Sequence, residues 1–266
     1  MQALLFRNWF SKLNGAVIDA FEYYIKILEN NPHFRLIIID GLDFEPLYEV
    51  FENRYFLDDI NYRDNIMFVT RNDLIYMNFD KVLVLDYSTI KETRGLLHAK
   101  EIIVISDLYT DNPLFMYDKK LNKVTYYGEM PFVYKDVQYR MKCLFCRFKR
   151  LHRLKEGYYI NSPRNEDFSF VNKLEINHTL PIYYKQDDHV NNFFELFHCY
   201  IYYHANTYFD PHPRLFLECM FYKKSILYYN ERAIKDGSYY RYRDLYENGL
   251  DDRRLNKNDE IVRLFI

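Results

Sequence analysis

Two acidic residues and one arginine in the last quarter of the chain could bind an activated sugar. Asp210 and Glu218 are separated by seven residues, and Arg214 lies between them on an expected helix. Carboxylates accept hydrogen bonds from sugar hydroxyls, whereas an arginine and a helix N-terminus together bind a diphosphate. The same residues also fit an ordinary surface helix that carries an Arg214–Glu218 pair four residues apart. Both interpretations are open at this point.

Alternating elements in the first half would form the framework for such a site. Continuous apolar runs are typical of strands covered on both faces, and apolar residues spaced three to four apart are typical of helices. Strands that alternate with helices indicate a parallel, doubly wound sheet. These patterns predict strands at 3–6, 34–39, 66–70, 81–85 and 101–105, and helices at 16–29, 44–53 and 88–99.

A second set of elements follows an interruption at residues 111–134. A basic helix expected over 136–155 is followed by Gly157, and glycine commonly terminates helices. We predict an α/β protein with two Rossmann-like domains, residues 1–155 and 156–266, that face each other across a cleft. The second domain is expected to hold strands at 158–161, 180–184, 199–203 and 226–229, and helices at 190–197, 214–222 and 259–265.

The composition is that of a globular protein. Hydrophobic residues make up 49% and charged residues 28% of the chain, and the net charge of −2 gives no overall attraction to nucleic acid. The 28 tyrosines and 22 phenylalanines could stack on bases or sugars, but the codon usage of a low-GC genome explains most of them. Neither a signal peptide nor a membrane span is expected. We therefore expect a cytoplasmic protein, in the host cytoplasm if it is viral.

Several signature motifs are absent from the sequence. It contains no G-x-x-x-x-G-K-[ST], no G-x-G-x-x-G and no G-x-S-x-G, which disfavours P-loop ATPases, dinucleotide oxidoreductases and typical α/β-hydrolases. It contains no Asp-x-Asp, which disfavours a metal-dependent glycosyltransferase of the GT-A type. Cys143 and Cys146 form a C-x-x-C without the second pair that a structural zinc site would need. We predict no metal site and no cofactor.

Three polar loops are expected where strands end, at residues 7–15, 161–165 and 204–213. In parallel α/β sheets, ligands bind outside the carboxyl ends of the strands. Gly15 would let the backbone approach a ligand closely, although it would serve equally well as an ordinary helix start.

Two of these segments give the chain a resemblance to a known family. Residues 15–24 follow the first strand, and Asp210-x7-Glu218 with Pro213-Arg214 resembles the E-x7-E signature of many retaining GT-B-fold glycosyltransferases. The tandem halves extend the resemblance over most of the chain. The nearest compact relatives that we consider are small phage enzymes that glycosylate modified DNA bases.

The resemblance implies roles for individual residues. Asp210 would contact the sugar hydroxyls of the donor, and Glu218 would contact the nucleotide ribose. Arg214 would hold the diphosphate, and positive charge near the departing diphosphate would supply the main catalytic effect. That charge would come from Arg164 and Lys173, which could equally be solvated surface residues. The implied donor-binding set is Gly15, Arg164, Lys173, His212, Arg214, Leu215 and Glu218, and the implied catalytic set is Asp19, Asp210 and Arg164.

An inverting reaction would also need a general base. Asp19, Asp107 and His98 are candidates from the first half, and Asp19 is favoured because it lies near the glycine loop. Each has a structural alternative: a first-turn helix acid, a turn residue or a cation at a helix C-terminus. A retaining reaction needs no protein base, because the donor phosphate can take the acceptor proton.

Residues 140–155 are strongly basic and contain interleaved aromatic residues. They could lie along a phosphate backbone, or they could form the solvated face of an amphipathic helix.

These observations lead to one hypothesis and one alternative. The first is a metal-independent transferase that moves a sugar from a UDP- or GDP-linked donor to an acceptor hydroxyl, on a hydroxymethylated base in viral DNA or on a glycan. The alternative is a non-catalytic two-domain α/β module that binds nucleic acid or a protein.

Overall fold

The computed structural model divides the chain into two compact units. The first comprises Met1–Phe148 and Arg253–Ile266, and the second comprises Lys149–Asp252. The structure describes residues 1–7, 15–40, 45–106, 117, 123–128, 137–139, 148–151, 153–161, 168–184, 193–203, 214–229 and 257–266. Both units contain a parallel sheet, so the predicted α/β class is confirmed.

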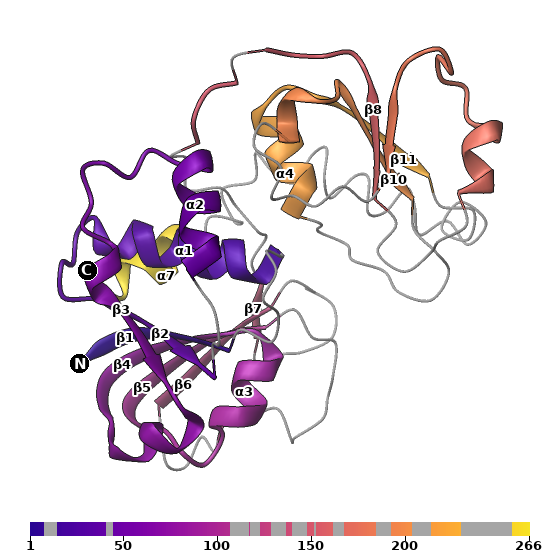
Figure 1. Cartoon of the computed structure of the whole chain (residues 1–266). Helices are drawn as coiled ribbons and strands as arrows, with labels where there is room; N and C mark the ends of the chain where they lie inside the picture. The colour runs from indigo at the N-terminus through magenta and orange to yellow at the C-terminus, as the bar shows by residue number, and fades with distance from the viewer. Residues whose placement is uncertain are drawn as a thin grey trace. The chain divides into compact units, whose positions relative to one another are not determined.

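The first unit contains a seven-stranded parallel sheet with the strand order β3-β2-β1-β4-β5-β6-β7 (Figure 1). The central strand β1 pairs with β2 on one side and with β4 on the other. The order therefore reverses between β1 and β4, which is the switch point of a Rossmann-like sheet. The strands are β1 (Gln2–Arg7), β2 (Arg35–Ile39), β3 (Ile66–Val69), β4 (Asn78–Leu85), β5 (His98–Ser106), β6 (Lys123–Gly128) and β7 (Val137–Tyr139).

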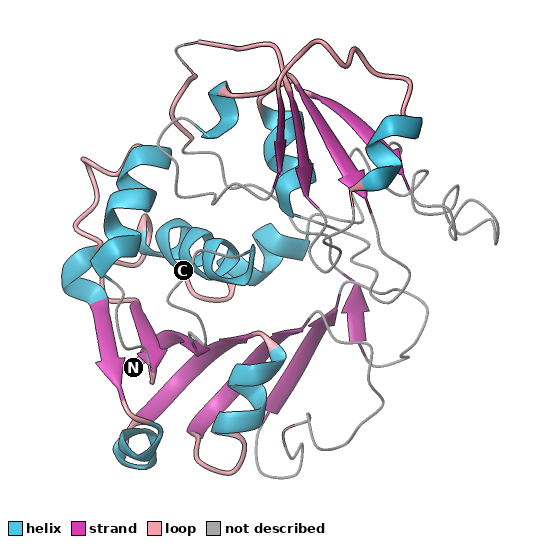
Figure 2. Cartoon of the chain, turned by 45° about the vertical axis from the view of Figure 1, so that its right-hand side comes forward, coloured by secondary structure: helices cyan, strands magenta, loops and turns pink. Residues whose placement is uncertain are grey.

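Helices cover both faces of this sheet. Helix α1 (Gly15–Leu28) lies over one face and α3 (Tyr87–Thr93) over the other, as Figures 1 and 2 show. The connection from β1 to β2 and the connection from β4 to β5 run toward opposite edges of the sheet. Because both are right-handed, their helices lie on opposite faces. The buried stretches of the central strands are continuous apolar runs for the same reason, and all four residues of the run Ala3–Phe6 are buried. The unit also contains α2 (Glu45–Arg54) and two 3-10 helices, η1 (Arg63–Asn65) and η2 (Arg71–Tyr76).

The C-terminal helix α7 (Lys257–Arg263) belongs to the first unit, not to the second domain to which we assigned residues 156–266. The ring centroids of Phe34 and Phe265 are 5.2 Å apart, and Asn31 Nδ2 donates to the Phe265 carbonyl at 2.7 Å. Phe265 is completely buried by these contacts. The apolar face of the last helix therefore completes the core under α1.

The second unit contains a four-stranded parallel sheet with the order β11-β10-β8-β9. Its order reverses between β8 and β10, because β8 pairs with β9 on its other side. One face is covered by η4 (Ser169–Lys173), and the other carries an aromatic cluster of Tyr159, Phe193, Phe197 and Tyr200. The elements are β8 (Tyr158–Asn161), β9 (Ile182–Tyr184), η5 (Phe193–Glu195), β10 (Cys199–Tyr203), α4 (Arg214–Phe221) and β11 (Ser225–Tyr229).

Two helix predictions are wrong in the described residues, and a third is correct in its first part but too long. The helix expected over 136–155 is replaced by β7, which pairs with β6, and by a bridge in which Phe148 packs on Tyr55 with ring centroids 4.8 Å apart. The helix expected over 190–197 is the single 3-10 turn η5. The helix expected over 88–99 ends at Thr93, because His98 already pairs with Asn78 at the start of β5. In each case sheet pairing or aromatic packing outweighs local helix propensity.

Candidate functional site

Polar residues follow four neighbouring strands of the first sheet, at the edge where these strands end. Arg7 ends β1, Asp40 follows β2, Thr70 and Arg71 follow β3, and Asp86 follows β4. Adjacent strands lie roughly 5 Å apart, so these residues form a row across the switch point. This is the edge at which ligands bind in open parallel sheets.

Two arginines of this row, Arg7 and Arg71, form ion pairs with Glu92 of α3. Arg7 Nη1 lies 2.8 Å from Glu92 Oε1, and Arg71 Nη1 lies 3.1 Å from Glu92 Oε2. Arg7 Nε lies 3.6 Å from Asp40 Oδ2, and the Arg71 backbone N–H donates to Asp40 Oδ1 at 3.2 Å. The Arg7 backbone N–H donates to Thr89 Oγ1 at 2.9 Å. Residues from β1, the β2 end, η2 and α3 thus form one network, which we call the switch-point cluster.

Two aspartates of this edge adopt left-handed backbone conformations. Asp40 has φ 52° and Asp86 has φ 73°. Both continue the sheet ladder, since the Asp40 N–H donates to the Val69 carbonyl at 2.9 Å and the Asp86 N–H to the Ile105 carbonyl at 3.0 Å. Aspartate tolerates this conformation better than most residues, and it turns the chain sharply at the strand end. The Asp86 carboxylate also accepts a hydrogen bond from the Ser88 hydroxyl.

The residues of the switch-point cluster are not among the site residues predicted from the sequence, although the sequence contains a signal for them. Asp40 and Asp86 directly follow the apolar strands predicted at 34–39 and 81–85, and Asp107 follows the strand predicted at 101–105 after one residue. We considered only Asp107, which lies outside the described residues. An acidic residue after several parallel strands could have been recognised, but its partners Arg7, Arg71 and Glu92 come from distant segments.

In the second unit, the two strands beside the order reversal lead into the two loops that we predicted to bind the donor. β8 ends at Asn161, where the segment 161–165 begins, and β10 ends at Tyr203, just before the segment 204–213. Arg164, Asp210 and His212 lie in these segments, outside the described residues.

Arg214 and Glu218 form the pair that their spacing predicts. Arg214 Nε lies 3.3 Å from Glu218 Oε1, and each side chain is only 3% exposed. Arg214 is the first residue of α4, and the neighbouring Leu215 is buried as well. The surface-helix interpretation is therefore wrong on exposure, because the pair is removed from water. Removing two charges from water has a large desolvation cost, so the loss of either partner would leave an uncompensated buried charge.

The other predicted site residues are dispersed over both units. Gly15 is the first residue of α1, and Asp19 is buried one turn further along the same helix. Lys173 is exposed at the end of η4. His98 is the first residue of β5, so it is not the helix C-terminal cation that we considered. Within the second unit, Arg214, Leu215 and Glu218 lie together on α4, and within the first unit Gly15 and Asp19 lie one turn apart on α1.

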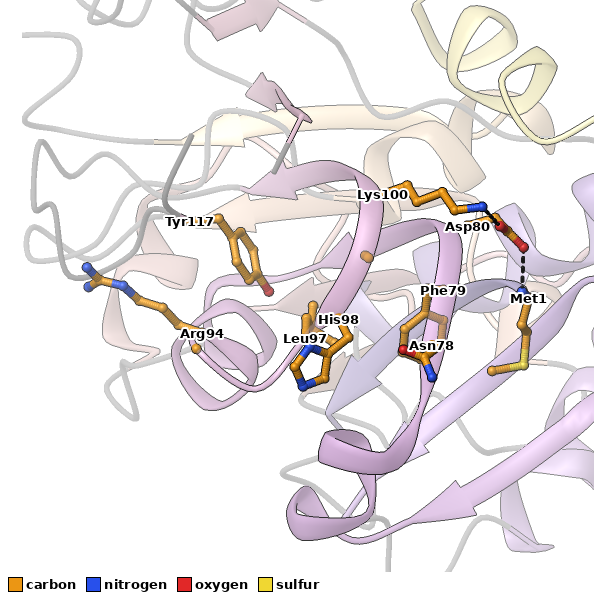
Figure 3. A pocket seen from close by; sticks show the side chains of 11 residues that line it. Met1, Asn78, Phe79, Asp80, Arg94, Leu97, His98, Lys100 and Tyr117 are labelled. Atoms are coloured by element: carbon orange, nitrogen blue, oxygen red, sulfur yellow. Dashed lines mark hydrogen bonds and ion pairs between the residues drawn. The ribbon is translucent and has the colours of Figure 1, made fainter. Parts of the chain in front are cut away.

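A cavity of about 720 Å³ opens at the opposite edge of the first sheet, where β4 and β5 begin (Figure 3). Phe79, Leu97 and Tyr117 form its apolar part, and Arg94 and His98 contribute polar groups. The Lys100 ammonium donates to Asp80 at 2.6 Å, and this contact, with that of the chain's amino group, lowers the pKa of Asp80 to about 2.

Comparison of the chain with protein-family models, with curated proteins and with solved structures finds no match. Within the described residues, no helix has the length and apolar character required to cross a membrane. The topology therefore defines the chain as an α/β protein with Rossmann-like sheets.

Proposed function

We propose that the protein is a metal-independent glycosyltransferase of the GT-B type. It would transfer a sugar from a UDP- or GDP-linked donor to an acceptor hydroxyl. The observation that supports this proposal is the topology of the second unit. Strands β8 and β10 flank its order reversal and lead into the two predicted donor loops, and α4 with Arg214 and Glu218 follows the second loop.

The donor chemistry follows from this order of elements. The backbone N–H groups at the start of α4 would bind the diphosphate, because a helix N-terminus carries partial positive charge. Glu218 would contact the ribose, which requires its side chain, now only 3% exposed and paired with Arg214, to turn toward the ligand. Asp210, His212, Leu215 and Gly15 would complete the binding of the donor. Arg164 and Lys173 would offset the charge that develops on the leaving diphosphate.

The acceptor would bind to the first unit, as a hydroxymethylated base in viral DNA or as a glycan. Asp19 would act as the general base if the reaction inverts configuration. Asp19 is buried on α1, so this role requires that the acceptor hydroxyl approach the start of that helix closely. The expected location is the cytoplasm, or the host cytoplasm for a viral protein.

Thermal stabilisation by nucleotide sugars tests the proposal. A donor at about 100 times its dissociation constant should stabilise the protein by about 2.7 kcal/mol. Asp210→Ala should abolish this stabilisation, whereas Lys155→Ala, which removes an exposed lysine of the same unit, should leave it unchanged. Incubation with labelled donor and candidate acceptors, followed by mass spectrometry, would then identify the product.

No response to any nucleotide sugar would contradict the proposal. If the protein instead bound DNA with strong salt dependence, the non-catalytic module would be the better description.

A further inference from the structure

We propose that the first unit binds a ligand with a vicinal diol at its switch point, with Asp40 as the acceptor of the two hydroxyl hydrogens. The proposal goes beyond the transferase function, and it holds whether or not the second unit binds a nucleotide sugar.

The topology supplies the place. Helices α1 and α3, which follow β1 and β4, cover opposite faces of the sheet, and in open parallel sheets ligands bind at the carboxyl ends of strands that diverge in this way. Asp40 follows β2, the strand next to β1, and its backbone is held to β3 by the hydrogen bond to Val69. An acid at the end of the second strand of such a sheet is positioned to bind a ribose hydroxyl.

The contacts of Asp40 hold its carboxylate in one orientation. Arg7 approaches Oδ2 and the Arg71 backbone N–H donates to Oδ1, so both oxygens are held from the protein side. The side chain nevertheless remains 38% exposed. A carboxylate has about four acceptor positions, so positions on the solvent side remain for a ligand. A group that is already oriented loses little conformational entropy on binding.

The charges of the switch-point cluster favour a neutral hydroxyl donor over an ion. The charges of Arg7 and Arg71 are balanced by the carboxylates of Asp40 and Glu92, so the cluster has no net positive charge that would favour a phosphate. Within the described residues, no three carboxylate, imidazole or thiol groups gather closely enough to hold a metal ion. A diol avoids both difficulties, because two adjacent O–H groups donate to one carboxylate in charge-assisted hydrogen bonds.

Arg71 adds a second contact for the same ligand. Its side chain is 50% exposed while Nη1 contacts Glu92. A guanidinium has five N–H donors in a planar arrangement, so the exposed part of Arg71 can donate to the diol oxygens while Asp40 accepts from them.

Two sources of a vicinal diol are chemically equivalent here, the ribose of a nucleoside and the ring of a free sugar. Isothermal titration of the full chain with adenosine, uridine, their 2′-deoxy counterparts and methyl α-mannoside distinguishes them. Binding of the ribonucleosides but not the deoxynucleosides identifies a ribose site. Binding of the mannoside alone identifies a sugar site. Absence of binding by every diol at millimolar concentration, or equal binding of the deoxynucleosides, overturns the proposal.

Variants locate the site. Asp40→Asn keeps the shape but removes the charged acceptor, and it should weaken diol binding roughly tenfold or more. Asp58→Asn, which changes an exposed aspartate of the same unit, should leave binding unchanged. Unaltered affinity in Asp40→Asn would overturn the proposal.

Two further measurements keep the result interpretable. Hydrogen exchange of the wild-type chain should show protection by the diol in peptides that cover 35–40 and 69–76, even if Asp40→Asn does not fold. The double variant Arg214→Met/Glu218→Leu should bind the diol normally. If that variant lost diol binding while remaining folded, the ligand would lie in the second unit and the proposal would be wrong.

Discussion

Both units contain contacts between arginine and carboxylate side chains at or after the ends of their central strands. These are the switch-point cluster in the first unit and the Arg214–Glu218 pair in the second, and they differ in their exposure to solvent. In the first unit, the side chains of Arg7, Asp40, Arg71 and Glu92 are 14% to 50% exposed. In the second unit, Arg214 and Glu218 are each 3% exposed. The first arrangement can exchange a protein contact for a ligand contact at low cost, whereas the second is part of the folded core.

This difference teaches that charge type and spacing do not by themselves distinguish a binding group from a structural one. Arg214 and Glu218 have the spacing of a site, yet their side chains are removed from solvent. Arg71 and Asp40 belong to no recognisable sequence motif, yet both lie at the switch point and their side chains are partly exposed to solvent. Burial makes the loss of either partner costly in the second unit, whereas Asp40 and Arg71 are accessible to a ligand without a rearrangement of the chain.

The largest expected effect follows from breaking the buried pair. Glu218→Ala should lower the free energy of unfolding of the second unit by about 3–5 kcal/mol, because it leaves the Arg214 charge buried without its carboxylate. Glu92→Ala in the first unit should cost about 1 kcal/mol, since its arginine partners are more exposed. Urea denaturation followed by hydrogen exchange in each unit measures both values.

The double variant Arg214→Met/Glu218→Leu serves as the control for this comparison. Apolar residues of similar volume should recover most of the lost stability. If Glu218→Ala and Glu92→Ala lowered the free energy of unfolding equally, burial would not explain a difference in stability contribution between the two contacts.

An intermediate effect is expected from pH, with opposite signs in the two units. Burial lowers the pKa of Lys224 to about 8 from 10.5, while its ammonium donates to the Phe197 carbonyl and lies 4.4 Å from the Phe197 ring centroid. Between these values the unfolded chain binds more protons than the folded one, so the stability of the second unit should rise with pH. Burial also raises the pKa of Cys199 to about 11, which opposes the rise above pH 9.

In the first unit, burial raises the pKa values of Tyr62 and Tyr127 to about 12 from 10.0. Their contribution is complete below pH 10 and is lost as the pH rises toward 12. Thermal unfolding of each unit from pH 7 to 11 should therefore show the second unit gaining stability between pH 8 and 9 and the first losing it above pH 10. Lys224→Met should remove the gain, and a gain that persisted in this variant would refute the assignment.

The smallest effect is expected at the amino edge of the first sheet. The pKa of Asp80 is lowered from 3.8 to about 2, mainly by the hydrogen bond from Lys100. The stabilisation is present above pH 3.8 and is lost as the pH falls toward 2. Asp80→Asn should remove this dependence and with it a small stabilisation at pH 7, and salt should weaken the effect, because both side chains are more than half exposed. A large loss of stability at pH 7 in this variant would show that the exposed Asp80–Lys100 pair contributes as much as the buried Arg214–Glu218 pair.

Several elements could be predicted from local patterns, and others could not. The strand expected at 34–39 is observed at 35–39, and the helix expected at 16–29 is observed at 15–28. The strand is predicted from its short continuous apolar run, and the helix from apolar residues spaced three to four apart. The expected basic helix over 136–155 has an equally clear local pattern, but β7 and the packing of Phe148 on Tyr55 replace it in the described residues.

The candidate site divides in the same way. The contact between Arg214 and Glu218 follows from their spacing on one helix, so the sequence predicted it. The contact between Asp40 and Arg71 joins residues that are 31 positions apart, and it exists because β2 and β3 are neighbours.

The amino-acid sequence by itself determined that the chain builds parallel α/β sheets, because strands buried on both faces must be apolar along their length. Only the tertiary structure decided the strand order, the return of α7 to the first sheet and the exposure of each charged pair. The physical reason is that strands pair through backbone groups that nearly every residue possesses, so no local pattern names a strand's neighbour. Exposure, in turn, depends on all the segments that pack around a side chain.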